Sequence, residues 1–125
     1  MNLQLKEAYD SVFSGWWSIL DEYIPKIKAV APDCKLMIKE KFGVLRIQPY
    51  DFTNCEYEKL NTLCDEAEVA SSTVCEYCGQ EGRLRDDEVW WHTLCDRCAA
   101  LDYEAQRKVI AECKAEHLKK QGVSV

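Results

Sequence analysis

Residues 75–79 read CEYCG and residues 94–98 read LCDRC, so two Cys-x-x-Cys pairs stand in the second half of the chain, separated by residues 79–94. Structural zinc takes four soft ligands at tetrahedral corners, and a two-residue spacer lets both thiolates of one pair reach the same ion. The spacing therefore predicts one structural zinc ion. Its expected ligands are Cys75, Cys78, Cys95 and Cys98.

The residues around the two pairs predict the shape of this zinc module. Gly79 suits a knuckle in which the backbone turns back toward the ion. Residues 83–85 and 89–93 are typical of two short strands, and a strong helix-forming pattern follows Cys98 and reaches about Lys120. A knuckle, a hairpin and a ligand pair on the first turn of a helix favour a treble-clef finger. A plain zinc ribbon, which lacks the helix, is the alternative.

Other uses of the eight cysteines fit the sequence less well. A thioredoxin-like pair lies between a strand and a helix of a βαβ unit, a context that neither pair has. An iron–sulfur cluster is the alternative metal group for four cysteines. Disulfide frameworks are typical of shorter chains poor in core residues, whereas 47% of these 125 residues are hydrophobic. The remaining cysteines are interpreted as buried small hydrophobic residues: Cys34, Cys55, Cys64 and Cys113.

The N-terminal residues predict an amphipathic helical segment. Apolar side chains recur three or four residues apart through residues 3–30, as on one face of a helix. We expect a break near Ser14 and Gly15, and a kink or an early end at Pro25.

A β-hairpin and a second helix are expected next. Residues 34–50 alternate in polarity, with a turn at residues 40–43 and Pro49 expected to end the pairing. Thr53 and Glu56 fit a capping box, so a helix is expected from there to about residue 71, with a strongly acidic outer face and Tyr57 among its inward residues.

The expected fold is therefore α+β, with N-terminal helices, a β-hairpin and an acidic helix packed on a C-terminal treble-clef finger that carries a long terminal helix. We expect one compact domain. It divides into a helix–hairpin–helix region at residues 1–72, the zinc module with its terminal helix at residues 73–120, and a loose tail at residues 121–125.

The charge of the chain bears on its partners. The net charge is −6, and most of the excess of Asp and Glu falls in residues 51–99. Such an acidic body repels a phosphate backbone. The N-terminus shows no basic start followed by an apolar run, and no apolar stretch is long enough for a membrane helix. A cytoplasmic location is the expectation.

The sequence offers little for catalysis. A treble-clef HNH nuclease needs histidines for its catalytic metal, but this chain has only His92 and His117, and Ala99 stands where a histidine would follow the second pair. His92 is interpreted as a strand residue, and Cys113 as a core residue of the last helix. The chain is therefore predicted not to be an enzyme.

Two tryptophan pairs and the hairpin tip could contact a partner. Neighbouring tryptophans point in different directions on a strand or a helix, so one ring of each pair, Trp16–Trp17 and Trp90–Trp91, could stay exposed as an anchor. The charged tip around residues 39–43 is a binding loop or simply a solvated turn. The candidate contact residues are Trp17, Lys39, Lys41, Phe42, Trp90 and Trp91.

Several motifs together resemble a known group of proteins. They are Gly15-Trp16, the stretch IKEKFGVLR at residues 38–46, and the two cysteine pairs with Gly79 and Leu94. The chain resembles small bacteriophage and prophage proteins that end in a CxxC–CxxC zinc module, although it has Val44 where that group often has a second glycine. The resemblance implies a phage or mobile-element setting and no established activity.

Charge, zinc and spare aromatic side chains together favour a non-catalytic protein-interaction module. We expect an acidic inhibitor or adaptor of a host defence or transcription protein, whose basic surface it would cover by imitating phosphate charge. The alternative is a nucleic-acid-binding zinc-finger regulator. Its expected binding residues are Arg83, Arg85, Arg97 and the basic residues of the terminal helix.

Overall fold

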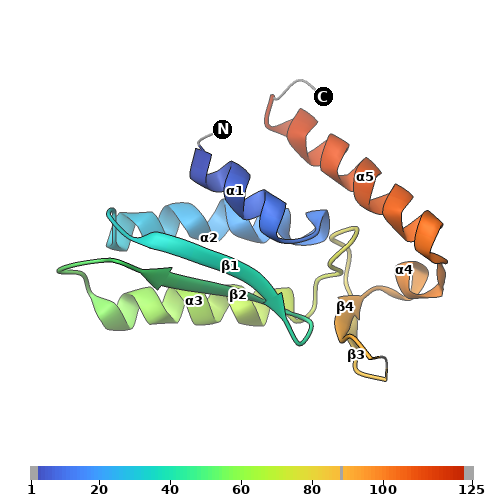
Figure 1. Cartoon of the computed structure of the whole chain (residues 1–125), viewed down its shortest axis with the longest axis horizontal. Helices are drawn as coiled ribbons and strands as arrows, with labels where there is room; N and C mark the ends of the chain where they lie inside the picture. The colour runs from blue at the N-terminus through green and yellow to red at the C-terminus, as the bar shows by residue number, and fades with distance from the viewer. Residues whose placement is uncertain (1–2, 88, 123–125) are drawn as a thin grey trace.

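The computed structural model describes residues 3–87 and 89–122, which form a mixed α+β fold as predicted (Figure 1). The N-terminal half comprises α1 (Leu3–Ser11), the short 3-10 helix η1 (Ser14–Trp16), α2 (Trp17–Val30), β1 (Lys35–Lys41), β2 (Val44–Tyr50) and α3 (Tyr57–Ser71). The C-terminal half comprises β3 (Arg83–Arg85), β4 (His92–Leu94), α4 (Asp96–Ala100) and α5 (Tyr103–Lys120). The two strand pairs form separate two-stranded antiparallel sheets.

The N-terminal helices break where expected but do not end at the proline. The 3-10 helix η1 separates α1 from α2 at Ser14, which confirms the predicted break. Pro25 lies inside α2, which continues to Val30, so the predicted early end is wrong. Ile24 and Ile27 are both buried on either side of the proline. Their packing offsets the one helical hydrogen bond that proline cannot donate.

The hairpin is tighter and longer than predicted. Its turn contains only Phe42 and Gly43, with φ angles of 53° and 81°, the positive values that a two-residue type I′ turn requires. Pro49 stands opposite Leu36, and pairing continues to Tyr50. Pro49 is tolerated because both strands of this hairpin are edge strands. The expected end of pairing at Pro49 is therefore wrong.

Helix α3 starts without the predicted capping box. Glu56 is its N-cap residue and makes no capping bond, while the Thr53 hydroxyl donates to Asp33 Oδ2 at 3.0 Å. Tyr57, expected to face inward, is 59% exposed. Glu58, Asp65 and Glu66 are exposed as predicted, so the outer face of α3 is acidic.

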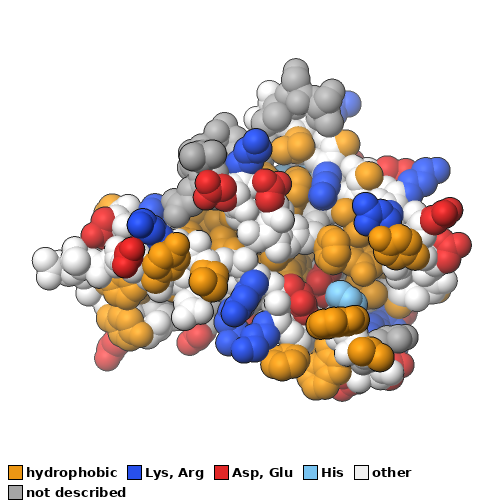
Figure 2. Space-filling model, in the orientation of Figure 1, with side chains coloured by type: hydrophobic (Ala, Val, Ile, Leu, Met, Phe, Trp, Pro, Cys, Tyr) orange, Lys and Arg blue, Asp and Glu red, His pale blue; other side chains and the backbone are white. Residues whose placement is uncertain are grey.

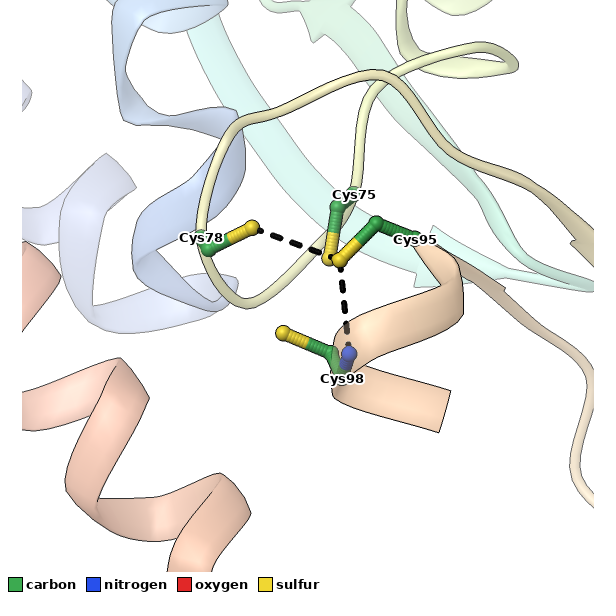
Figure 3. Close-up of side chains that lie close together, drawn as sticks. All are labelled: Cys75, Cys78, Cys95 and Cys98. Carbon is green, nitrogen blue, oxygen red and sulfur yellow. Dashed lines mark hydrogen bonds between the residues drawn. The ribbon is translucent and has the colours of Figure 1, made fainter. Parts of the chain in front are cut away.

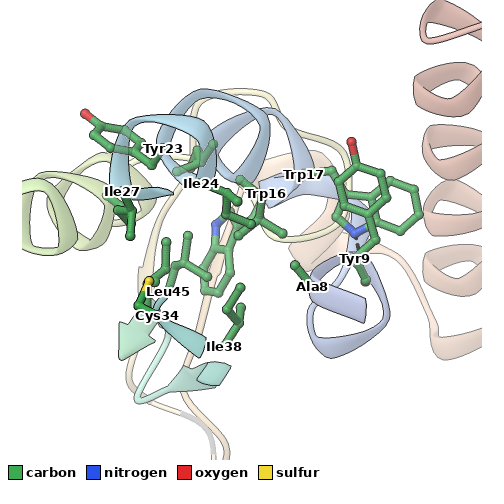
Figure 4. Packing of buried hydrophobic residues seen from close by; sticks show 14 of the residues in the cluster. Ala8, Tyr9, Trp16, Trp17, Tyr23, Ile24, Ile27, Cys34, Ile38 and Leu45 are labelled. Carbon is green, nitrogen blue, oxygen red and sulfur yellow. Dashed lines mark hydrogen bonds between the residues drawn. The ribbon is translucent and has the colours of Figure 1, made fainter. Parts of the chain in front are cut away.

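The main core lies where α1, α2 and α3 meet the inner face of the hairpin. Ile38, Leu45 and Ile47 turn inward from the strands, as their alternation predicts. Figure 4 shows Trp16, the last residue of η1, reaching toward the hairpin residues Ile38 and Leu45. The Trp16 ring is fully buried, and its Nε1 donates to the Val74 carbonyl at 2.9 Å. The core thus extends to the residue that precedes the first cysteine pair.

The C-terminal half departs from the predicted single helix. Helix α4 ends at Ala100, and α5 begins at Tyr103 after Asp102, whose side chain accepts a hydrogen bond from the Ala105 amide at 2.9 Å. This N-cap satisfies an amide that has no helical partner, so it starts a new helix in a new direction. None of the helices in the part of the chain described has the length and apolar character of a membrane span.

Candidate metal centre

The structure brings together the four cysteines predicted as ligands (Figure 3). Cys75 and Cys78 come from the knuckle after α3, where the Gly79 amide donates to the Cys75 carbonyl at 3.0 Å and Gly79 has a φ of 82°. Cys95 is the N-cap residue of α4, and Cys98 lies on that helix. The four Sγ atoms all lie within 4.8 Å of one another. We call these residues the four-cysteine group.

The spacing of the sulfur atoms fits a metal shell. Cys78 Sγ and Cys95 Sγ are 3.7 Å apart. Tetrahedral coordination with bonds of about 2.3 Å places neighbouring sulfurs roughly 3.8 Å apart, whereas a disulfide needs about 2.05 Å. All eight cysteines are free. The four-cysteine group is therefore suited to a structural metal ion.

Burial and crowding favour the neutral form of most of these thiols unless a cation lies among them. Burial raises the pKa of Cys78 to about 11, and the neighbouring Cys75 adds to the rise. Burial and the same neighbour raise the pKa of Cys98 further. Burial also acts to raise the pKa of Cys95, but hydrogen bonds from the Cys98 amide and the other thiols outweigh it, so that pKa is lowered. Four thiolates can share this space only when a positive charge lies among them.

The core around the cysteines is small. Its buried residues are Cys75, Tyr77, Leu94 and Cys98, with Val109 and Ile110 of α5 partly buried against them. Helix α5 itself has no buried residue within the described part. So small an apolar core provides little burial free energy, and a metal ion held by the four cysteines would supply much of the stability of this module.

Hydrogen bonds join the cysteine module to the N-terminal half. The Thr93 hydroxyl of β4 donates to the Gly43 carbonyl at the hairpin turn, at 2.6 Å. The Ser14 hydroxyl lies 3.1 Å from both the Tyr77 and the Ile110 carbonyl oxygens. Because the Thr93 and Ser14 side chains are buried, the contacts fix the hairpin and the start of η1 against the module.

Glu76 is a site residue that the sequence analysis did not identify. Although it lies between the first two cysteines, its side chain is only 1% exposed and its Oε2 is 3.1 Å from His92 Nδ1. Burial raises the pKa of Glu76, and the bond to Glu76 raises the pKa of His92. The sequence contains no pattern that predicts the burial of Glu76, because a charged residue between two cysteines of a knuckle is normally expected at the surface. His92 lies in β4, as predicted, and is not part of the four-cysteine group.

Phe42, Trp90 and Trp91 come together on the surface. Phe42 at the hairpin turn stacks at a tilt on Trp91, with ring centroids 5.7 Å apart. Val89, which the sequence analysis did not single out, is 93% exposed beside them. Figure 2 shows hydrophobic side chains gathered on this face, next to a histidine and acidic side chains. We call Phe42, Val89, Trp90 and Trp91 the aromatic patch.

The other candidate contact residues divide into two kinds. Lys39 and Lys41 are exposed on β1, on the strand that leads to Phe42. Trp17 is only 4% exposed, stacks on Tyr9 with centroids 4.2 Å apart, and donates its Nε1 proton to the Tyr9 carbonyl. The Trp17 ring is covered by Tyr9 of α1 and by His117 of α5, whose ring centroid lies 5.7 Å away, and Trp17 is therefore removed from the candidate contact surface.

The arginines of the nucleic-acid alternative are partly engaged with the protein itself. Arg85 donates to Asp96 Oδ1 at 2.7 Å and to the Leu94 carbonyl at 3.0 Å. Its side chain is 15% exposed, whereas that of Arg83 is 70% exposed and lies 3.9 Å from the same carboxylate. Arg97 is exposed on α4. The three arginines do not form a row of free cations.

Comparison of the chain with protein-family models, with curated proteins and with solved structures finds no match. The resemblance to phage proteins therefore stays a prediction, and the function has to be argued from the structure alone.

Proposed function

We propose that the four-cysteine group holds one structural zinc ion and that the module around it is a treble-clef finger. Four thiolates and the sulfur spacing of 3.7 Å suit tetrahedral zinc. The arrangement of knuckle, β3–β4 hairpin and α4, with Cys98 on the helix, supports the treble clef over a ribbon. The ion would serve structure, because all four coordination positions are filled by protein.

We further propose that the protein is a non-catalytic interaction module that binds another protein through the aromatic patch. The observation that carries this proposal is the exposure of large apolar side chains from two separate elements on one surface. Phe42 is 65% exposed, Trp90 76% and Trp91 41%. Exposed apolar clusters of this kind mark interaction sites, and tryptophan is enriched among residues that dominate binding energy.

The charge around the patch indicates the chemistry of the partner. The patch belongs to the acidic part of the chain, residues 51–99, through its tryptophans, and Asp86 and Asp87 lie exposed just before Val89. Glu40 and the exposed Lys41 border the patch from the hairpin, with Lys41 Nζ 5.8 Å from the Phe42 ring centroid. The excess of carboxylates belongs to residues 51–99 as a whole, including the exposed outer face of α3. We therefore propose a partner that offers an apolar pocket for Trp90 and a basic surface around it, as in a nucleic-acid-binding host protein that a phage-encoded inhibitor or adaptor would cover.

The proposal is tested with a matched pair of variants. Trp90→Ala removes the most exposed ring of the patch, while Tyr103→Ala removes a ring of similar exposure, 69%, from α5. Tagged wild-type and variant proteins are used to capture partners from nuclease-treated bacterial lysate, followed by calorimetry with the purified candidate. We expect a defined protein that binds the wild type and Tyr103→Ala but binds Trp90→Ala at least about tenfold more weakly.

Two results would count against this function. One is capture of the same proteins by wild type and Trp90→Ala, which would show that the patch does not bind. The other is recovery of nucleic acid when nuclease is omitted, with binding that weakens steeply as salt is added, because that dependence is typical of phosphate contacts.

A further inference from the structure

A second group of potential metal ligands lies beside the cysteine module. Glu40 near the end of β1, Glu76 in the knuckle and His92 at the start of β4 each place one ligand atom within 4.8 Å of the others. These residues are distant in sequence and meet because the hairpin docks on the module. We propose that Glu40, Glu76 and His92 form a second metal site, which takes a divalent first-row ion that prefers carboxylate and imidazole ligands, such as Mn²⁺, Fe²⁺ or Zn²⁺.

The buried carboxylate of Glu76 is the strongest sign of a ligand. Its Oε2 accepts a hydrogen bond from the Thr93 amide at 2.8 Å and lies near His92 Nδ1. Its Oε1 is buried and has no hydrogen-bond partner among the described residues. Leaving a buried carboxylate oxygen unpaired is costly, and a metal ion bound at this oxygen would remove that cost.

The separation of the Glu76 and His92 ligand atoms is compatible with one shared ion. Glu76 Oε2 and His92 Nδ1 are 3.1 Å apart. Two ligand atoms at about 2.1 Å from the same ion lie roughly 3.0 Å apart at right angles and roughly 3.4 Å apart in a tetrahedron. The pair is close enough to bind one ion once the two groups turn from their mutual hydrogen bond toward it, and the metal would replace the hydrogen between them.

Glu40 is held in place by the turn. Its Oε1 accepts a hydrogen bond from the Gly43 amide at 2.6 Å, so the Glu40 carboxylate is fixed against the hairpin turn, close to Glu76 and His92. Two carboxylates and one imidazole then meet in a partly buried place. A divalent cation would offset the repulsion between the carboxylates, which a single imidazole offsets only in part.

The proposed site differs from the four-cysteine group because it is open. A hollow of about 200 Å³ borders Glu40, Glu76 and His92 and reaches Asp10 at the end of α1 and Lys114 of α5. Three protein ligands leave at least one coordination position, which water or an anionic group can fill from this hollow. The inference is independent of the aromatic patch and of its partner.

Mn²⁺ is the probe that separates this site from the thiols, because it prefers oxygen ligands over thiolates. Protein that retains its metal at the cysteines is titrated with Mn²⁺, and free Mn²⁺ is measured by electron paramagnetic resonance. Glu40→Gln removes the ligand charge, yet its amide oxygen can still accept the bond from Gly43. Glu58→Gln, on the exposed outer face of α3, is the matched control. Elemental analysis and circular dichroism establish that each variant is folded with its cysteine-bound metal.

We expect the wild type to bind one Mn²⁺ per chain, Glu58→Gln to bind it equally well, and Glu40→Gln to bind it at least about tenfold more weakly. His92→Gln tests the ligand contributed by β4 and should weaken Mn²⁺ binding to a similar degree. The proposal is overturned if the folded wild type binds no Mn²⁺ below about 1 mM. It is equally overturned if the Glu40→Gln and Glu58→Gln variants bind the ion alike.

Discussion

The backbone amide of Gly15 donates a hydrogen bond of 2.7 Å to the carbonyl oxygen of Glu76. This bond joins η1, at the break between the first two helices, to the knuckle that carries Cys75 and Cys78. The two backbones approach so closely that a Cβ atom at Gly15 would lie 1.9 Å from the Cys75 carbonyl oxygen. Glycine at this position therefore allows the N-terminal half to contact the metal module directly.

Replacing Gly15 with alanine is expected to separate the two halves. The added methyl group would collide with backbone atoms of both Cys75 and Glu76, which cannot move without disturbing the knuckle. We expect the free energy of unfolding to fall by about 3 kcal/mol, measured by urea denaturation. Gly122→Ala is the control, because a Cβ there meets nothing within 4 Å and its cost, about 1 kcal/mol, comes only from the positive φ. Equal losses in the two variants would contradict the steric argument.

Cys78→Ser is expected to release the metal. The variant removes one of four thiols, and the small core of the module cannot hold the knuckle and α4 together without the ion. We expect loss of bound metal by elemental analysis and a melting temperature lower by at least about 10 °C. Cys113→Ser, a half-buried cysteine of α5 outside the group, should keep its metal. A Cys78→Ser protein with wild-type metal content and melting behaviour would show that Cys78 is not a ligand.

The four-cysteine group could be predicted from sequence because its chemistry is local. Each Cys-x-x-Cys pair sits on one turn, so spacing alone specifies which thiols can share an ion. The buried face of the hairpin could be predicted equally well, because the alternation of apolar and polar residues around Ile38 and Ile47 indicates which side faces the core. The cysteine spacing is a short-range signal and the strand alternation is a periodic one, so both can be recognised in the sequence.

The features that the sequence did not predict depend on docking. The burial of Glu76 results from the hairpin turn and β4 packing over the knuckle, and no pattern within residues 75–79 reports it. Thr53 and Glu56 matched a capping box, yet the Thr53 hydroxyl bonds to Asp33 from a different segment. Pro25 suggested a helix end, but buried neighbours carry α2 past it. In each case a tertiary contact outweighs a local preference.

Thr93→Val tests the contact between β4 and the hairpin turn. The Thr93 side chain is fully buried, and its hydroxyl donates to the Gly43 carbonyl at 2.6 Å. Valine has nearly the same shape but cannot donate, so we expect a loss of about 1–2 kcal/mol in the free energy of unfolding. Thr62→Val, exposed on α3 with a hydroxyl bonded to Glu58, should change stability by less than about 0.5 kcal/mol. If the two losses were equal, the Gly43 contact would not stabilise the docked hairpin.

Ser71 and Ser72 give a matched pair at the end of α3. In the register of the hairpin, Lys41 and Val44 close the turn, so the next amide of β2, that of Leu45, points away from β1. The Ser71 hydroxyl oxygen accepts this amide at 2.8 Å, and both residues are fully buried. The Ser72 hydroxyl donates instead to the Val69 carbonyl of its own helix.

Ser71→Ala would leave the buried Leu45 amide without an acceptor, because alanine provides none and no water reaches a fully buried position easily. We expect a loss of about 1–3 kcal/mol by urea denaturation, together with faster hydrogen exchange at the Leu45 amide by nuclear magnetic resonance. Ser72→Ala should stay within about 0.5 kcal/mol of wild type and leave that amide protected. Unchanged protection at Leu45 in Ser71→Ala would mean that the serine does not fasten β2 to α3.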